Sequence, residues 1–253
     1  MDVDFSIITI ENNSNTFLNF KTYLRTQIGV NYELIVVKNE NGEFSSAREA
    51  FNSVLKRVKG TYVIFIHPDV FLTQNDILYN LLISLKSLKN FGIVGVAGRK
   101  KYLSKSDLTT ISNITQGSNR ENAGKTLSEP VKVQSVDECL FVMQSKRIMK
   151  SGFTNIPGWH LYAVEECIIS ELQGLSNYVV PINGIWHMSS GNSLDETYMT
   201  ILNKIFNRYD KYLIENKLNT TVKLWSFNTK LDFLYLKYYF YKQKIKKRLI
   251  RRK

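Results

Sequence analysis

The sequence predicts a single α/β domain with a mostly parallel central sheet covered by helices on both faces. The first hundred residues alternate strand-like runs with helix-like segments: strands at 5–10, 34–37, 62–66 and 91–97, and helices at 15–27, 45–59 and 75–88. The strand-like runs are apolar almost throughout, as expected for strands buried on both faces. The 253-residue chain is 43% hydrophobic and 22% charged, so it has ample apolar material for one core.

The second half of the chain continues this pattern less regularly. Residues 99–130 are polar and predict a long loop, which in a compact domain is usually functional or mobile. The further elements that we expect are strands at 131–143, 178–181 and 185–187 and helices at 160–173, 195–217 and from about 229. We therefore predict one domain over residues 1–220 and a helical basic tail over residues 221–253.

The positive charge is concentrated in that tail. Residues 222–253 hold eleven Lys or Arg and one acid, Asp232, so they contribute +10 of the net charge of +12. Because the body carries only +2, a whole-domain nucleic-acid binder is disfavoured. Aromatic residues followed by Lys and Arg favour docking on an anionic membrane surface; an RNA-contacting arm and packing on the body or a partner are the alternatives.

Three features predict a cytoplasmic protein, and the basic tail favours a peripheral position on the inner face of the cell membrane. Cys139 and Cys167 have no metal-ligand or CxxC spacing and read as buried, reduced thiols. The acidic start, Met1-Asp2-Val3-Asp4, does not resemble a signal peptide. No apolar stretch reaches the length of about 20 residues that a membrane span needs.

Polar residues follow three of the predicted strands. Glu11-Asn12-Asn13 follows Ile10, Lys38-Asn39-Glu40 follows Val37, and His67-Pro68-Asp69 follows Ile66. In open α/β sheets ligands bind beyond the carboxyl ends of the strands, so these turns are candidates for holding a nucleotide or a metal. No Gly-x-Gly-x-x-Gly follows the first strand and no complete Gly-x-x-x-x-Gly-Lys-Ser/Thr loop occurs, which disfavours dinucleotide-binding and P-loop proteins.

The His67-Pro68-Asp69 turn is the first candidate for chemistry. Proline makes the turn rigid, and a carboxylate there can bind a divalent cation that bridges phosphate oxygens. The alternative is an ordinary turn in which Asp69 caps the next element.

Two further segments carry candidate groups. Glu165 and Glu166 lie in the first turns of a predicted helix, where the backbone dipole keeps a carboxylate ionised for use as a base; dipole stabilisation alone is the alternative. His187 follows a strand and precedes small residues, and a lone histidine is usually structural. However, the chain has only three histidines and all of them lie in these three segments, which favours a shared site.

These segments together resemble bacterial glycosyltransferase family 2-like proteins. The matching residues, in family order, are Ala47-Arg48 to Asn52, Tyr62 to Val70 ("YxxFxHxDV"), Gly92 to Gly98, Val136-Asp137 ("VDG"), Phe153 with Gly158 to Tyr162 ("F…WHFYD"), and His187 to Gly191 ("HxSxG"). Each motif alone is weak, but the ordered set, over about residues 4–210, is fairly specific.

The resemblance implies a GT-A fold, a Rossmann-like three-layer sandwich, and a role for each matching residue. Asp69 and His187 would be metal ligands for Mn²⁺ or Mg²⁺. Glu165, or Glu166 beside it, would be the catalytic base, and Asp137 would lie near the donor sugar or acceptor. The nucleotide of a UDP-sugar would lie near Ile10, Glu11, Asn39, Arg48, Asn52 and His67.

The sequence also departs from the family pattern at three positions. His67 stands in place of the first Asp of the metal motif, and Glu138 stands in place of the glycine of "VDG". Ala163 replaces the Asp that follows the aromatic pair, so a neighbouring glutamate would have to act as base.

The predicted function is metal-dependent, inverting transfer of a sugar from a nucleotide-diphosphate donor to a glycan, lipid-linked or protein acceptor. Residues 99–130 could close over the donor. The main alternative is a catalytically degenerate protein that binds a sugar nucleotide on the same fold. A nucleotidyltransferase is a further alternative, but it would need a Gly-rich basic loop after the first strand, where this chain has Glu11-Asn12-Asn13. A role as a structural assembly protein would be supported by the tail alone.

Overall fold

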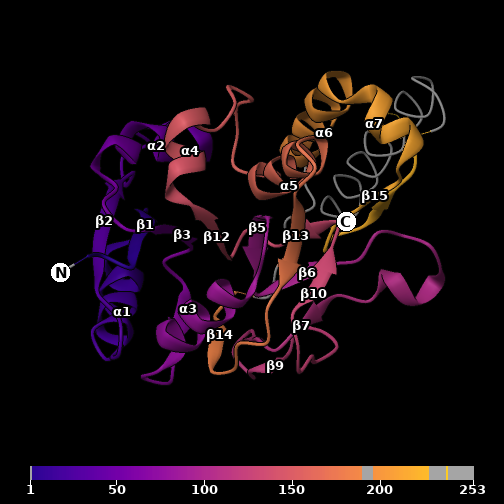
Figure 1. Cartoon of the computed structure of the whole chain (residues 1–253). Helices are drawn as coiled ribbons and strands as arrows, with labels where there is room; N and C mark the ends of the chain where they lie inside the picture. The colour runs from indigo at the N-terminus through magenta and orange to yellow at the C-terminus, as the bar shows by residue number, and fades with distance from the viewer. Residues whose placement is uncertain (1, 190–195, 228–237, 239–253) are drawn as a thin grey trace, which may run out of the picture.

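The computed structural model describes residues 2–189, 196–227 and 238, and within them the chain folds around one seven-stranded sheet (Figure 1). The strand order is β10-β13-β5-β12-β3-β1-β2. The bounds of these strands are β1 (Phe5–Glu11), β2 (Tyr32–Lys38), β3 (Tyr62–Ile66), β5 (Phe91–Gly95), β10 (Val131–Val133), β12 (Leu140–Gln144) and β13 (Ser176–Val179).

Most strands of this sheet point the same way. β1 pairs in parallel with both β2 and β3, and β13 pairs in parallel with β5. β12 lies between β3 and β5 and is antiparallel to both, and β10 is antiparallel to β13 at the edge. The prediction of a mostly parallel sheet is therefore confirmed, with two reversed strands that the sequence pattern did not reveal.

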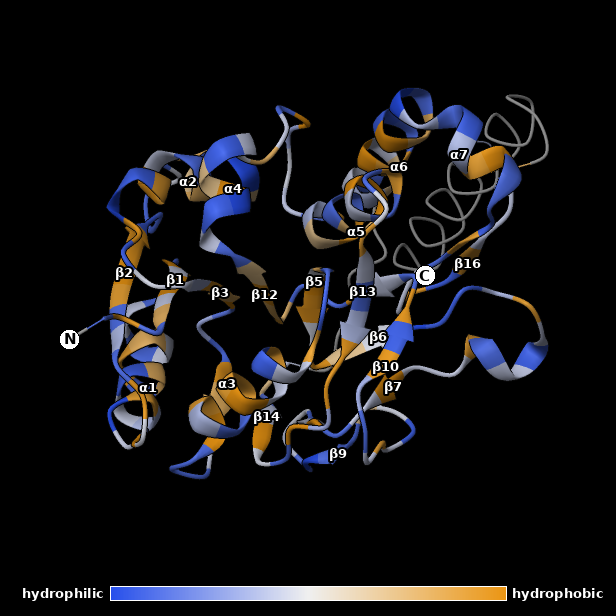
Figure 2. Ribbon diagram, viewed as in Figure 1, coloured by the Kyte–Doolittle hydropathy of each residue, from blue (hydrophilic) through white to orange (hydrophobic). Residues whose placement is uncertain are grey.

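Helices cover both faces of the sheet, giving three layers (Figure 1). α1 (Ser14–Leu24) and α3 (Ile77–Ser87) pack on one face, and α2 (Ala47–Val54), α4 (Ser145–Ser151) and α5 (Tyr162–Leu172) pack on the other. Successive strand residues serve opposite faces: Ile7 belongs to the first core cluster and Ile8 to the second. Because both faces are buried, the inner strands are largely apolar, and β2 and β5 are mostly orange in Figure 2.

Short strands extend the structure beyond the central sheet. Their bounds are β4 (Val70–Leu72), β6 (Ala97–Arg99), β7 (Ile111–Ser112), β8 (Thr115–Gln116), β9 (Glu121–Asn122), β11 (Ser135–Val136) and β14 (Ile185–His187). They form one sheet in the order β4-β14-β8-β9 and another in the order β11-β6-β7. The segment 99–130, predicted as a loop, thus contains three of these strands and a 3₁₀ turn, Lys105–Leu108.

Two predicted elements are broken in the structure. The strand expected at 131–143 is β10, β11 and β12, with a turn at 137–139 between the last two. The helix expected at 195–217 is α6 (Glu196–Arg208) and α7 (Asp210–Glu215) within the described residues. The first break matters for function, because it takes Asp137 and Glu138 out of the sheet.

A local capping signal explains the start of α2. Ser46 caps α2 by accepting the backbone N–H of Glu49 at 3.1 Å, as the Ser-x-x-Glu pattern predicts. α2 then passes into a 3₁₀ turn, Leu55–Arg57, and ends before Gly60. Gly60 is required for a different reason: a Cβ there would lie 2.4 Å from the backbone nitrogen of Ser6. The glycine therefore allows the backbone of β1 to lie close to the backbone at residue 60.

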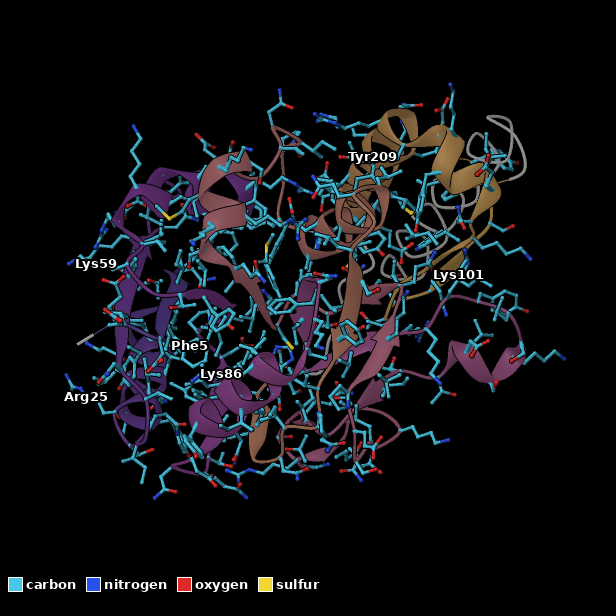
Figure 3. All side chains as sticks on the ribbon, viewed as in Figure 1. Phe5, Arg25, Lys59, Lys86, Lys101 and Tyr209 are labelled. Atoms are coloured by element: carbon cyan, nitrogen blue, oxygen red, sulfur yellow. The ribbon has the colours of Figure 1, made fainter. Side chains whose placement is uncertain are left out.

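Charged side chains project from this fold while its centre is apolar. Phe5 is completely buried, whereas Arg25, Lys59, Lys86 and Lys101 are exposed and extend outward in Figure 3. Both cysteines are buried and unpaired, as predicted. Among the helices of the described part of the chain, none is long and apolar enough to cross a membrane.

The predicted boundary at residue 220 falls inside a β-hairpin. β15 (Leu218–Asn219) pairs with β16 (Leu224–Trp225), and Trp225 and Phe227 are each 1% exposed in a third core cluster with α5 and α6. The globular domain therefore extends to at least residue 227. The helix expected from about residue 229 lies outside the described residues, except for Tyr238.

Trp225→Ala is expected to lower the free energy of unfolding by about 3–5 kcal/mol, because it removes a large buried side chain. Trp159→Ala is the matched control: Trp159 is 39% exposed, and its loss should cost less than about 1 kcal/mol. Urea unfolding measures both values. A loss of unfolding free energy for Trp225→Ala as small as that for the control would show that residues after 220 do not belong to the domain.

Candidate active site

The turn between β3 and β4 is held in place by hydrogen bonds to two distant segments. The backbone N–H of His67 donates to the carbonyl of Cys139 at 2.9 Å, next to the 137–139 turn. β4 pairs antiparallel with β14 so that Val70 lies opposite His187, and the N–H of Met188 donates to the carbonyl of Asp69 at 2.9 Å. Strand pairing therefore fixes His187 beside Asp69.

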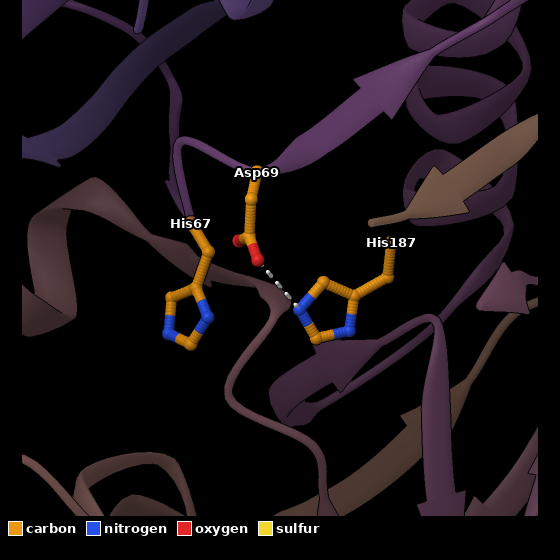
Figure 4. Close-up of side chains that lie close together, drawn as sticks. All are labelled: His67, Asp69 and His187. Atoms are coloured by element: carbon orange, nitrogen blue, oxygen red, sulfur yellow. Dashed lines mark ion pairs between the residues drawn. The ribbon is translucent and has the colours of Figure 1, made fainter. Parts of the chain in front are cut away.

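Three side chains meet at this turn (Figure 4). His67, Asp69 and His187 each offer one ligand atom, and these atoms all lie within 4.8 Å of one another. Asp69 Oδ2 lies 3.5 Å from His187 Nε2. Two imidazoles and one carboxylate are a donor set that suits a divalent transition metal such as Mn²⁺. The two residues predicted as metal ligands are thus brought together, and His67, predicted near the nucleotide, joins them.

The electrostatics of the cluster favour, at Asp69 and His67, the protonation states that metal ligands need. Burial opposes ionisation of Asp69, but the hydrogen bond and charge of His187 outweigh it and lower the pKa of Asp69 to about 2. Burial lowers the pKa of His67, which keeps that ring neutral. Burial also acts to lower the pKa of His187, but its contact with Asp69 prevails and raises it. A carboxylate and a neutral imidazole are ready to bind a cation.

Tyr162 orients the ring of His67. The Tyr162 hydroxyl lies 2.7 Å from His67 Nε2. Tyr162 is the first residue of α5. Partners of this kind fix which nitrogen of a ligand histidine is available. Tyr162, which the sequence pattern identified only as part of an aromatic motif, thus contacts the cluster directly.

A cavity of about 450 Å³ opens beside the cluster. His67 and His187 line it together with Asp137 and Glu138 from the turn after β11. The start of α5 and residues 220–222 of the C-terminal hairpin form further parts of the wall. A cavity of this size can hold a small ligand.

Asp137, predicted to lie near the donor sugar or acceptor, lines this cavity. The N–H of Asp137 donates to the carbonyl of Ala97 at 2.8 Å, which fixes the turn. Its Oδ1 accepts the N–H of Cys139 at 3.0 Å, and its Oδ2 accepts the hydroxyl of Thr221 at 2.7 Å. Thr221, which no sequence signal marked, thus ties the C-terminal hairpin to the site.

Arg48 and Glu165, predicted for the nucleotide and for catalysis, form a buried ion pair. Arg48 Nε and Nη2 each lie 2.8 Å from Glu165 Oε2, and both side chains are 1% exposed. Arg48 also donates to the backbone oxygens of His160 and Leu161 at 3.2 and 3.0 Å. These contacts connect α2 to the segment that opens α5, so the pair positions the wall of the cavity without lining it.

The remaining oxygen of Glu165 is also occupied. Oε1 accepts the hydroxyls of Thr154 at 2.9 Å and of Tyr209, labelled in Figure 3, at 3.0 Å. A general base needs an oxygen that meets the acceptor hydroxyl. The position of Glu165 therefore does not fit the role of base, because every contact it makes is structural.

Glu166 is placed in a similar way. It is 2% exposed and lies 3.4 Å from Arg147 Nη2, away from the residues that line the cavity. Burial raises the pKa of Glu166 to about 7, although Arg147 opposes the shift. Its position also fits a structural role better than the predicted catalytic one.

The other predicted nucleotide contacts lie outside the cavity wall, and several shape the backbone. Asn52 donates to the carbonyl of Phe153 at 2.9 Å and accepts its N–H at 2.8 Å. Asn39 accepts the N–H of Phe44 at 2.8 Å and so shapes the turn after β2. Ile10 and Glu11 lie at the end of β1, where Glu11 is opposite Lys38 in the sheet.

Sequence comparison places this arrangement in a known group. Residues 6–209 match the family described as "Glycosyltransferase like family". The chain belongs to this glycosyltransferase-like family. The resemblance drawn from the ordered motifs is thereby confirmed, and the matched residues include His67, Asp69 and His187 as well as Asp137 and Glu138.

Solved structures confirm the fold of this glycosyltransferase-like protein. GalNAc-T7 with UDP, GalNAc and Mn²⁺ superimposes with a TM-score of 0.60 at 9% identity, covering 84% of this chain and 50% of that one. S. aureus TarS 1-349 with UDP-GlcNAc gives 0.55 at 13% identity, with 80% and 65% covered. The mannosyltransferase PcManGT from Pyrobaculum calidifontis, with GDP-Man and Mn²⁺, gives 0.54 at 11% identity, with 83% and 65% covered.

The present chain thus spans between half and two thirds of the length of these solved chains. A relative of more similar length is described as "ATP synthase subunits region ORF 6" from Fuscovulum blasticum. It is 24% identical over 187 residues, which are 71% of this chain and 72% of the relative.

Glu165→Gln is expected to lower the free energy of unfolding by about 3–5 kcal/mol, because it leaves Arg48 buried without its counter-charge. The double variant Arg48→Met/Glu165→Leu should be closer to wild type, since it removes both charges together. Chemical denaturation of the three proteins tests this. A single variant as stable as wild type would contradict the structural role.

The raised pKa of Glu166 predicts a pH dependence of stability. A carboxyl whose pKa is higher in the folded state contributes stability at low pH that is lost as the pH rises through the folded value, here about 7. Between about pH 4.5 and 7.5, wild type should lose roughly 1–3 kcal/mol relative to Glu166→Gln. Parallel stability curves for the two proteins, measured by urea unfolding, would refute this.

Proposed function

We propose that this protein transfers a sugar from a nucleotide-diphosphate donor to a hydroxyl group, with a divalent cation held by Asp69, His187 and His67. The observation that carries the proposal is the His-Asp-His cluster opening onto a cavity that two acidic residues also line. A ligand set beside an acidic pocket at the carboxyl edge of a mostly parallel sheet is where phosphate and sugar groups are expected to bind.

The cation and the cavity have separate tasks in this proposal. A bound divalent metal supplies positive charge that stabilises the diphosphate as it departs. The protein provides the three ligand side chains and orients His67 through Tyr162. Two nitrogen donors favour Mn²⁺ over Mg²⁺, which prefers oxygen ligands. Asp137, fixed by Thr221, forms part of the cavity wall beside the cluster.

A UDP-sugar is the donor that we favour. UDP and UDP-GlcNAc are named in two of the similar structures, although GDP-Man is named in a third. The nucleoside would lie along the carboxyl ends of β1 and β2, near Ile10, Glu11 and Asn39. Arg48 and Asn52 would support that region from behind, through the backbone contacts they make.

We further infer a single displacement at the anomeric carbon, which inverts its configuration, with a glycan, lipid-linked or protein acceptor. A lipid-linked acceptor would agree with a basic aromatic tail that docks on an anionic membrane surface. Residues 228–237 and 239–253 of that tail lie outside the described residues, so this part of the proposal is supported by composition alone.

A catalytically degenerate sugar-nucleotide-binding protein is the second candidate. The observation that favours it is Ala163, fully buried at the start of α5, where the related motif carries an aspartate. Mn²⁺-dependent release of UDP from a UDP-sugar separates the two candidates, because a binding protein would retain the donor intact.

Asp69→Ala is expected to abolish Mn²⁺ binding and with it sugar transfer, since it removes the only carboxylate ligand of the described cluster. Thermal-shift titrations with Mn²⁺ and a panel of UDP-glucose, UDP-galactose and UDP-GlcNAc measure binding; UDP release measures turnover. At 100 times the dissociation constant a ligand stabilises by about 2.7 kcal/mol, which is readily detected.

Asp76→Ala is the control for this substitution, because Asp76 is exposed and its side chain makes no helix-capping bond. It should respond to Mn²⁺ as wild type does. Transfer by Asp69→Ala at the wild-type rate would eliminate the cluster as the metal site.

A further inference from the structure

Glu138 carries the one cavity-lining carboxyl group with a free hydrogen-bonding position among the described residues. Its Oε1 is buried and accepts no hydrogen bond from any described residue. Both oxygens of its neighbour Asp137 are already used, by Cys139 and Thr221. A buried polar atom without a partner is uncommon and calls for an explanation, such as a substrate group that supplies the missing hydrogen bond.

The start of α5 holds this carboxyl group in position. The backbone N–H groups of Tyr162 and Ala163 face it and favour its charged form. Leu161, the residue before α5, provides no side-chain cap and adopts a left-handed conformation with φ of 60°. Glu138 therefore acts as the acidic partner of this helix N-terminus, reaching it from the turn between β11 and β12.

This contact connects two of the positions where the sequence departs from the related motifs. Glu138 stands where those motifs have glycine, and Ala163 stands where they have aspartate. The two positions are neighbours in space, because the Ala163 N–H faces the Glu138 carboxyl group. The carboxyl group of Glu138 therefore lies beside position 163, where the related motifs carry the carboxyl group of an aspartate.

The surroundings of Glu138 suit a group that takes up a proton near neutral pH. Burial and the charge of Asp137 raise its pKa to about 8, against the opposing effect of Arg48. Burial, with a smaller contribution from the charge of Glu138, raises the pKa of Tyr162 well above its usual value and that of Tyr198 to about 12. The tyrosines therefore stay neutral while Glu138 titrates. General bases work best when their pKa lies near the working pH.

We propose that Glu138 is the general base of the sugar transfer, an assignment that rests on the proposed function. The carboxylate of Glu138, which lines the cavity, accepts the proton of the acceptor hydroxyl while the hydroxyl oxygen forms a bond to the anomeric carbon. The bond between the anomeric carbon and the diphosphate oxygen breaks, and its electron pair leaves with the nucleoside diphosphate. Glu165 and Glu166 do not compete for this role, because neither lines the cavity.

Glu138→Gln tests the assignment, because the amide keeps the size of the side chain and a carbonyl oxygen for the α5 N–H groups but cannot take up the proton. UDP release with water as acceptor is measured with Mn²⁺ and whichever of UDP-glucose, UDP-galactose and UDP-GlcNAc wild type turns over. The rate is expected to fall about 10²–10⁴-fold, with the Mn²⁺ and donor thermal shifts unchanged. Glu129→Gln, at an exposed position, should equal wild type.

Sodium azide distinguishes a base from a positioning residue. Azide attacks the anomeric carbon without losing a proton, so it should restore UDP release by Glu138→Gln, yield a glycosyl azide, and leave wild type little changed. The rise of the wild-type rate as pH increases through about 8 should also be absent from the variant.

Three results would overturn the assignment. A Glu138→Gln rate within threefold of wild type would show that another group takes the proton. A slow variant that azide does not restore would show that Glu138 only positions the site. A wild type that binds donor and Mn²⁺ without releasing UDP would instead refute the transfer itself, and the base with it.

Discussion

The pairing of β4 with β14 is the constraint on which the site depends. His187 follows Asp69 by more than a hundred residues, yet the register that places Val70 opposite His187 brings the two side chains to 3.5 Å. A slip of one residue in this short ladder would turn His187 to the other face of its strand. The Met188 N–H donates to the Asp69 carbonyl and holds the register at the turn itself. Backbone pairing therefore positions the side chains of Asp69 and His187.

A second constraint acts from the opposite side of the cavity. The buried Arg48–Glu165 pair connects α2 to α5, and Arg48 also holds the backbone of residues 160 and 161. These contacts set where α5 begins. The start of α5 in turn places Tyr162 against His67 and offers its N–H groups to Glu138. A pair predicted from the sequence to contact the nucleotide and to act in catalysis thus determines the geometry of residues that line the cavity.

Local periodicity was enough to predict α1, α2 and α3 and the strands β1, β2, β3 and β5, because both sheet faces are buried and the apolar runs are nearly continuous. It could not reveal that residues 131–143 break into three strands, since that break is imposed by pairing with β13, β6 and β3. Asp69 and His187 were predictable from their motifs. Glu138 was not, because its significance lies in its proximity to Ala163, which only the packing of α5 creates.

Two carboxyl groups near one cavity are pushed to opposite behaviours by their surroundings. Asp69 lies beside His187, which lowers its pKa to about 2, so it stays charged and suits a cation. Glu138 is buried beside Asp137, which raises its pKa to about 8, so it can take up a proton. Separated pKa values of this kind divide charge stabilisation from proton transfer between two groups. In the proposed displacement, the cation held by Asp69 would stabilise the departing diphosphate, and Glu138 would take the proton of the attacking hydroxyl.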